Sequence, residues 1–121
     1  MGKKPKVYFL GTCDTCRRIM KEVGVGGHME QQEIKSQPLD AQQIDELAKK
    51  AGSYEAIFSK KSQLYRSQGW HEKTMTEADY RKLLLEHYTF LKRPVFEIGN
   101  EVFAGNAKAV VEAVKNQLPK Q

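Results

Sequence analysis

A change of hydrophobic period near the N-terminus constrains this chain more than any other feature. Residues 6–10 (KVYFL) form a short, β-rich apolar run that is typical of a buried strand. The following apolar residues recur at the i, i+3, i+4 and i+7 spacing of one helix face, at Cys16, Ile19, Met20 and Val23. Gly24 then ends the helical pattern. A buried strand followed directly by an amphipathic helix predicts an α/β fold, with residues 11–13 between the two elements.

The middle of the chain predicts helices. Asp40 is placed as a helix cap, and Gly52 ends the helix that follows it. A short helical turn is expected over residues 53–58, whereas residues 59–73 have no clear period and predict mostly loop, with at most one helical turn. Thr76 opens a second long helix in a capping-box pattern, with its apolar face at Tyr80, Leu83, Leu84 and His87.

Three further strands and a last helix complete the expected order. Residues 28–34 alternate loosely and predict a weak strand, and residues 95–98 and 101–104 predict a hairpin with a two-residue turn. Asn106 is placed to cap a final helix whose apolar face is Ala107, Val110, Val111, Val114 and Leu118. The order β-α-β, a helical middle and then β-β-α predicts a mixed α/β (α+β) sheet protein with a single domain over residues 1–121.

The composition is that of an ordinary globular domain. Of the 121 residues, 40% are apolar and 29% are charged, which is enough for a core without disulfides or a structural metal. The longest apolar run, Val7–Leu10, is too short to span a bilayer or to form part of a signal peptide, so we expect a cytoplasmic protein without a membrane partner. The net charge of +5 comes from scattered basic residues, which does not favour direct binding of nucleic acid.

The two cysteines, Cys13 and Cys16, form a single Cys-x-x-Cys motif. In a cytosolic chain such a pair suggests redox chemistry before it suggests a structural disulfide. Cys13 lies at the expected helix start, where unpaired N–H groups and the helix dipole favour the nucleophilic thiolate, and Arg17 and Arg18 add positive charge nearby. Cys16 lies one turn later on the same face, so it can displace a group bonded to Cys13 and leave an intramolecular disulfide.

Two other interpretations of the cysteine pair remain open. A zinc site needs two further ligands, and the chain offers only three scattered histidines and no second cysteine pair. Both cysteines could instead be small core residues, which suits Cys16 better than Cys13 because Cys16 shares the apolar helix face. We favour thiol redox chemistry at Cys13.

A second candidate feature is the dipeptide Arg93-Pro94 before the predicted hairpin. Proline cannot donate a hydrogen bond to a strand ladder, and X-Pro is where cis peptide bonds occur. A cis bond at Pro94 would turn backbone polar groups toward a neighbouring site, where Arg93 could offer its planar fork to an oxyanion or a thiolate. The alternative is a basic loop that simply precedes an edge strand.

Two motifs together resemble the arsenate reductase/Spx (ArsC-like) family of thioredoxin-like proteins. They are residues 11–18 (GTCDTCRR) and residues 91–105, which contain Arg-Pro and the hairpin. The resemblance covers essentially the whole chain. It implies a thioredoxin-like fold over about residues 5–35 and 90–118, interrupted by a helical insertion over about residues 36–89.

The resemblance also implies a reaction. In reductases of this family the N-terminal cysteine attacks arsenate, arginines hold the oxyanion, glutathione resolves the adduct and glutaredoxin regenerates the thiol. Cys13 matches the nucleophile and Arg93 matches the arginine before the proline. Lys60 falls near the second arginine, where it keeps the charge but loses the bidentate fork. The third arginine position holds Gly105-Asn106, so the arsenate pocket is incomplete.

We therefore expect a thiol-dependent reductase that acts on arsenate, another small oxyanion or a disulfide. Cys13 attacks, Cys16 or glutathione resolves, and glutathione with glutaredoxin, or thioredoxin, supplies the reducing equivalents. No bound metal, flavin or nucleotide is expected, and we expect a monomer. The catalytic candidates are Cys13, Cys16 and Arg93, and the substrate-binding candidates are Lys60, Arg17, Thr12 and Pro94.

The alternative function is that of a regulator without catalytic activity. Spx-type members of the family carry a Cys-x-x-Cys redox switch and bind the C-terminal domain of the RNA polymerase α-subunit. Gly52 falls where those regulators have a glycine used in that contact, although the end of a helix explains this glycine more simply. A third interpretation is a redox-inert binding domain in which both cysteines pack.

Overall fold

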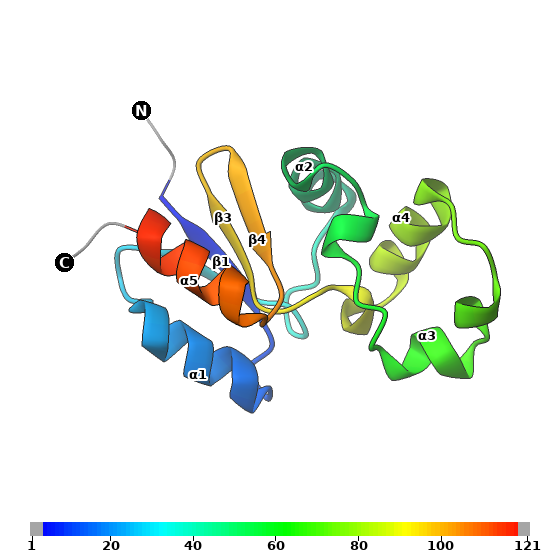
Figure 1. Ribbon diagram of the computed structural model, residues 1–121, viewed down its shortest axis with the longest axis horizontal. Coiled ribbons are helices and arrows are strands. Elements are labelled where there is room, and N and C mark those ends of the chain that lie inside the picture. The colour runs from blue at the N-terminus through cyan, green and yellow to red at the C-terminus, as the bar shows by residue number, and fades with distance from the viewer. Residues whose placement is uncertain (1–3, 119–121) are drawn as a thin grey trace. The chain divides into compact units, whose positions relative to one another are not determined.

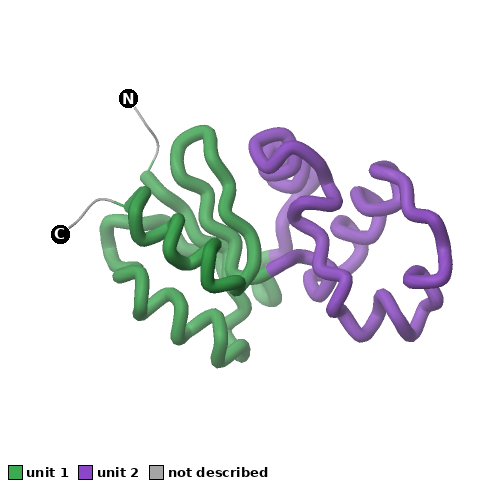
Figure 2. The backbone as a smooth tube through the Cα atoms, in the orientation of Figure 1, with its two compact units in different colours: residues 1–37, 93–121 green, residues 38–92 purple. Residues whose placement is uncertain are grey.

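The computed structural model (Figure 1) describes residues 4–118, and the chain divides into two compact units. Residues 1–37 and 93–121 form the first, which we call the sheet unit, and residues 38–92 form the second, the helical unit (Figure 2). This unit thus combines an early and a late segment of the chain. No helix within residues 4–118 is long and apolar enough to cross a membrane. The assignment of a single domain to the whole chain stays a prediction.

The sheet unit contains a four-stranded mixed sheet in the order β2-β1-β3-β4. β1 pairs in parallel with β2 and antiparallel with β3, and β3 pairs antiparallel with β4. The parallel pair joined by a helix and the following hairpin confirm the predicted mixed α/β class, including the weak second strand. The elements of this unit are β1 (Lys6–Phe9), α1 (Asp14–Val23), β2 (Glu30–Glu33), β3 (Val95–Ile98), β4 (Glu101–Ala104) and α5 (Lys108–Gln117).

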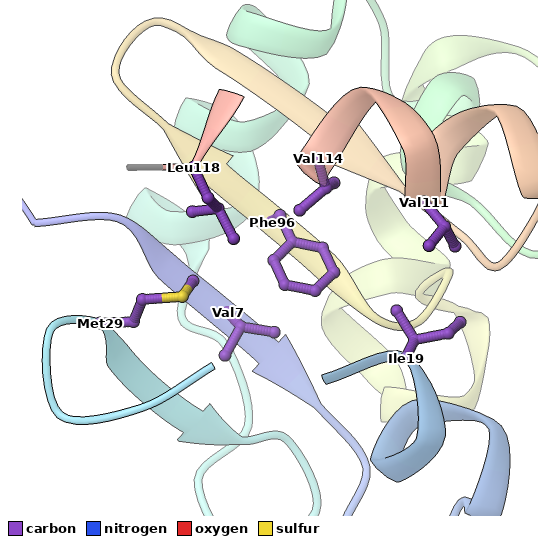
Figure 3. Close-up of a cluster of buried hydrophobic side chains, with 7 residues drawn as sticks. All are labelled: Val7, Ile19, Met29, Phe96, Val111, Val114 and Leu118. Atoms are coloured by element: carbon purple, nitrogen blue, oxygen red, sulfur yellow. The ribbon is translucent and has the colours of Figure 1, made fainter. Parts of the chain in front are cut away.

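A cluster of buried side chains holds α1 and α5 against the sheet. Val7 of β1 and Phe96 of β3 are partners in the antiparallel pair and meet side chains of both helices (Figure 3). Burial of one such side chain stabilises the fold by about 1.5–3 kcal/mol, so the core itself fixes the position of α1. The buried cluster consists of Val7, Ile19, Met29, Phe96, Val111, Val114 and Leu118.

The last helix begins later than the sequence predicts. We expect Asn106 as its cap, but α5 begins at Lys108 and its N-cap is Ala107, whose side chain makes no capping hydrogen bond. Ala107 is also exposed rather than part of the apolar face. The N–H of Gly105 donates to the Pro94 carbonyl at 2.9 Å, and the chain is still extended at Ala107 (φ −64°, ψ 145°). Asn106 therefore lies before the cap position, where it cannot serve the helix.

The helical unit follows the capping signals of the sequence. Asp40 and Thr76 cap α2 and α4, each in a complete capping box. Gly52 ends α2 with a φ of 104° and donates its N–H to the carbonyl of Ala48 at 2.9 Å, which confirms the helix-end interpretation of this glycine. The elements are α2 (Ala41–Ala51), η1 (Glu55–Ile57), α3 (Gln63–Ser67), η2 (Trp70–Glu72), α4 (Glu77–Glu86) and η3 (Tyr88–Phe90).

Packing around Phe58 explains where the prediction for this unit was wrong. Residues 59–73 contain two helical turns, α3 and η2, rather than at most one. Tyr65 of α3 is buried against Phe58, with ring centroids 5.5 Å apart, and a single buried tyrosine produces no period that could be read locally.

His87, expected on the apolar face of α4, instead ends that helix and is exposed.

A hydrogen-bonded ion pair joins α2 to α4 inside the helical unit. Asp45 accepts hydrogen bonds from the Arg81 guanidinium at 2.8 and 3.1 Å and from the Tyr54 hydroxyl at 2.7 Å. The bonds from Arg81 and then that from Tyr54 hold the pKa of Asp45 below its ordinary value, at about 2. The link between the two helices therefore persists as long as Asp45 is ionised.

Candidate active site

Cys13 lies where β1 gives way to α1. Its backbone is extended (φ −91°, ψ 112°), so it is the N-cap of α1. Its N–H donates to the carbonyl of Leu10 at 3.0 Å and closes a tight turn, while its sulfur accepts the N–H of Cys16 at 3.4 Å. An oxygen of Ser, Thr, Asp or Asn usually fills this position. Here a sulfur does, and the first-turn N–H groups and the helix dipole favour its anionic form.

The surroundings of Cys13 lower the pKa of its thiol below the ordinary value of 9.0. Partial burial alone would raise this pKa, but hydrogen bonds from Cys16 and Thr15 outweigh burial, and the positive charge of Arg93 adds to them. A lower pKa increases the fraction of nucleophilic thiolate at neutral pH. Because Cys13 is also partly exposed, this thiolate can meet a substrate.

Cys16 has the opposite properties. Its side chain is 0% exposed, and burial is the largest cause that raises the pKa of its thiol to about 12. The hydrogen bond with Cys13 and the charge of Cys13 raise it further. Both cysteines are free thiols. In the described part of the chain, residues 4–118, no three His, Cys, Asp or Glu side chains gather as a metal ion would require.

Arg93 and Pro94 connect the second sequence motif to the same site. The Arg93–Pro94 peptide bond is cis, and Pro94 is buried directly before β3. Because β1 and β3 are antiparallel, with Tyr8 opposite Val95, the start of β3 lies beside the end of β1, from which the chain leads to Cys13. The charge of Arg93 accordingly favours the Cys13 thiolate.

Comparisons with known proteins assign the chain to a family. A model of the ArsC family matches residues 8–114. The chain belongs to the ArsC family. Solved structures similar to this ArsC-family chain include an arsenate reductase from Vibrio cholerae, with 14% identity, a TM-score of 0.75 and coverage of 98% of this chain and 100% of that one. An arsenate reductase (ArsC) related protein from Brucella melitensis has 23% identity and a TM-score of 0.69, covering 92% of this chain and 93% of that one.

A third similar structure is the YFFB (PA3664) protein, with 20% identity, a TM-score of 0.75 and coverage of 95% of this chain and 99% of that one. A search of curated proteins found no match. At these identities the likeness concerns the fold, and it confirms the predicted thioredoxin-like architecture of this ArsC-family chain.

The other predicted site residues are placed as follows. Thr12 is exposed in the turn before Cys13. Arg17 is exposed on α1, and its guanidinium pairs with the carboxylate of Asp14. Lys60 belongs to the helical unit, where its Nζ lies 2.6 Å from a carboxylate oxygen of Glu55. The substrate-binding roles of Thr12, Arg17, Lys60 and Pro94 stay predictions.

One residue near Cys13 gives no functional signal in the sequence. Glu33 ends β2, and its carboxylate accepts the N–H of Gly11 at 2.8 Å. The strand around it (EQQE) is polar, so a glutamate there resembles an ordinary surface residue. Only the parallel register, which pairs Phe9 with Glu33, brings this carboxylate to the turn before Cys13.

Proposed function

We propose that this chain is a thiol-dependent reductase in which Cys13 attacks the substrate and Cys16 resolves the resulting adduct. The observation that carries the proposal is the contrast between the two thiols. The pKa of Cys13 is lowered, that of Cys16 is raised to about 12, and the sulfur of Cys13 accepts the Cys16 N–H at 3.4 Å. Membership of the ArsC family supports the same class of chemistry.

The first step is attack of the Cys13 thiolate on one sulfur of a small disulfide. A bond forms between the two sulfurs, the S–S bond of the substrate breaks, and its other half leaves as a thiolate. Cys16 then loses its proton to solvent and attacks the sulfur of Cys13. The bound half leaves as a second thiolate, and a Cys13–Cys16 disulfide remains. The substrate has gained two electrons from the protein, and glutathione, glutaredoxin or thioredoxin then supplies two electrons that reduce the Cys13–Cys16 disulfide.

The surroundings of Cys16 delay its deprotonation until Cys13 has reacted. Burial is the largest cause of the raised pKa of Cys16, and the hydrogen bond and charge of Cys13 add to it. In a mixed disulfide Cys13 carries no charge, so its electrostatic contribution disappears. The positive charge of Arg93, which lowers the pKa of Cys16, remains. The pKa of Cys16 thus falls once Cys13 is part of the mixed disulfide, and the Cys16 thiolate forms more readily when it has a sulfur to attack.

The charges of this chain favour a disulfide over arsenate as the substrate. An arsenate site needs several cationic forks around the oxyanion. Arg17 is paired with Asp14, and Lys60 is paired with Glu55. The charge of Arg93 acts on Cys13, and a single guanidinium serves one thiolate better than a multiply charged oxyanion.

A coupled assay of NADPH consumption tests the proposal. The mixed disulfide of glutathione and mercaptoethanol and, separately, arsenate are offered to the protein with either glutathione and glutaredoxin or thioredoxin as reductant. Because glutathione and glutaredoxin reduce this disulfide by themselves, rates are compared with those measured without the protein. We expect turnover of the disulfide above that rate, none above it with Cys13→Ser, and a remaining glutathione-dependent fraction above it with Cys16→Ser. Turnover of arsenate alone would overturn the substrate class.

Absence of turnover with both substrates would overturn the enzyme assignment and favour the Spx-type alternative. Binding of the reduced and the oxidised protein to the C-terminal domain of the RNA polymerase α-subunit then tests that alternative. Binding that depends on the oxidation state would support a redox-controlled regulator.

A further inference from the structure

The turn that presents Cys13 is a four-residue turn closed by its own backbone. It runs from Leu10 to Cys13, and the Cys13 N–H donates to the Leu10 carbonyl at 3.0 Å. Such a turn leaves the N–H of its second residue without a partner inside the turn. That residue is Gly11, and its N–H donates to Oε2 of Glu33 at 2.8 Å. A side chain from the neighbouring strand therefore holds the turn from outside.

The other oxygen of the Glu33 carboxylate holds the turn that follows β2. Oε1 accepts the N–H of Ser36 at 2.7 Å, the N–H of Lys35 at 3.1 Å and the hydroxyl of Ser36 at 2.9 Å. Hydrogen bonds from Gly11 and then Ser36 lower the pKa of Glu33, so the group is ionised at neutral pH. One carboxylate thus links the segments that leave the two parallel strands.

Glutamate is well suited to this place. Each carboxylate oxygen accepts from backbone N–H groups, one toward Gly11 and one toward Ser36. A glutamine amide would present an N–H₂ to one of these donors, and an aspartate is one methylene shorter. The parallel register with Phe9 opposite Glu33, continued by the bond from the Ile34 N–H to the Phe9 carbonyl at 2.8 Å, sets the distance to be spanned.

We propose that Glu33 is a positioning residue for Cys13: its carboxylate fixes the Gly11 peptide, and through it the turn that sets the sulfur of Cys13 on the first N–H groups of α1. The inference rests on the proposed role of Cys13 as the nucleophile. The bond from the Cys16 N–H to the Cys13 sulfur, 3.4 Å long, depends on where the turn holds Cys13, because a hydrogen bond weakens steeply as its angle departs from linear.

The direction in which Glu33 variants change the reactivity of Cys13 distinguishes a positioning role of Glu33 from a purely electrostatic one. A carboxylate that acted only by its negative charge would raise the pKa of a nearby thiol, so Glu33→Gln would then make Cys13 more reactive. A positioning role predicts the reverse, because loss of the hydrogen-bonded turn removes stabilisation of the thiolate. Glu33→Asp keeps the charge but loses reach, so positioning predicts that it behaves as Glu33→Gln does.

The test measures iodoacetamide alkylation of Cys13 against pH in the folded, reduced protein. We expect Glu33→Gln and Glu33→Asp each to slow alkylation at pH 6 by about threefold or more and to shift the pH profile upward. Glu30→Gln is the matched control, because Glu30 is an exposed glutamate of the same strand, and it should match the wild type. Circular dichroism of every variant establishes that it is folded.

Either of two results would overturn the inference: wild-type alkylation in both Glu33 variants, or faster alkylation in Glu33→Gln with no change in Glu33→Asp. If Glu33→Gln does not fold, Glu33→Asp decides alone. Alkylation requires no substrate, so this test remains informative even if the protein fails to turn over a disulfide, and the two proposals can fail separately.

Discussion

Alkylation of the reduced protein at pH 8 should modify Cys13 and leave Cys16 almost untouched. With a pKa of about 12, Cys16 is thiolate in roughly one molecule in ten thousand at this pH. A thiol with the ordinary value of 9.0 is thiolate in roughly one molecule in ten, and the pKa of Cys13 lies below that value. The thiolate populations of the two cysteines should therefore differ roughly a thousandfold or more. The higher nucleophilicity of the less acidic thiolate offsets part of this difference in the alkylation rates, and the burial of Cys16 adds to it.

Asp14 lies between the two cysteines, so proteolysis before aspartate separates them into different peptides for mass spectrometry. Unfolded protein, treated with the same reagent in urea, is the control and should be labelled equally at both positions. In Cys13→Ser the folded protein should remain almost unlabelled, because burial, the largest cause of the raised pKa of Cys16, is unchanged. Similar rates at both cysteines in the folded protein would contradict the assignment of the nucleophile to Cys13 and of the resolving thiol to Cys16.

Three further predictions concern charge and packing. Arg93→Gln should slow alkylation of Cys13 near neutral pH, because it removes a charge that lowers the pKa of that thiol. Arg93→Lys keeps the charge and should keep most of the rate. Equal rates in the wild type and both variants would show that Arg93 does not act on Cys13. The pKa of Asp45 is lowered to about 2, so the ionised Asp45 stabilises the fold above its ordinary pKa, and this stabilisation is lost as the pH falls toward 2. Asp45→Asn should therefore lower Tm at pH 7 and make Tm depend less on pH in the acid range. A pH profile of Tm parallel to that of the wild type would contradict this prediction. The side chain of Phe58 is 1% exposed, so Phe58→Ala should lower the free energy of unfolding by about 3–5 kcal/mol in urea titrations. A loss below about 1 kcal/mol would show that the packing of its aromatic neighbours does not depend on Phe58.

The elements that could be predicted are those whose signals lie within the element itself. Asp40 and Gly52 bound α2 as expected, because a cap hydrogen bond and a left-handed glycine are local requirements. The stripe from Cys16 to Val23 fixes both the existence of α1 and the face on which Ile19 is buried. A cysteine directly before such a stripe is expected at the helix N-terminus, and Cys13 is found there.

The features that could not be predicted depend on strand neighbours or on packing between distant segments. Pro94 marks Arg93 in the sequence as a candidate to meet an oxyanion or a thiolate, but which group it acts on follows only from the antiparallel placement of β3 beside β1. The bond of Glu33 to Gly11 depends in the same way on the parallel register of β1 and β2. The helical turn at Tyr65 exists because Phe58 covers it, and one aromatic contact is invisible to a search for periodicity.

The spacing of the two cysteines accounts for the difference in burial and pKa between them more than their immediate neighbours do. A residue at the N-cap points its side chain back toward the first N–H groups, whereas the residue three positions later has turned by about 300° and lies on nearly the same side of the helix. On α1 that side faces the core, so Cys16 is buried while its N–H still reaches the sulfur of Cys13. One more residue between them would rotate the second thiol by about 100° and move its N–H away from the cap. With one residue fewer, the second thiol would rotate by about 100° in the other direction and lose the burial that keeps it protonated. Two intervening residues are therefore the spacing at which one helix start both activates the first thiol and protects the second.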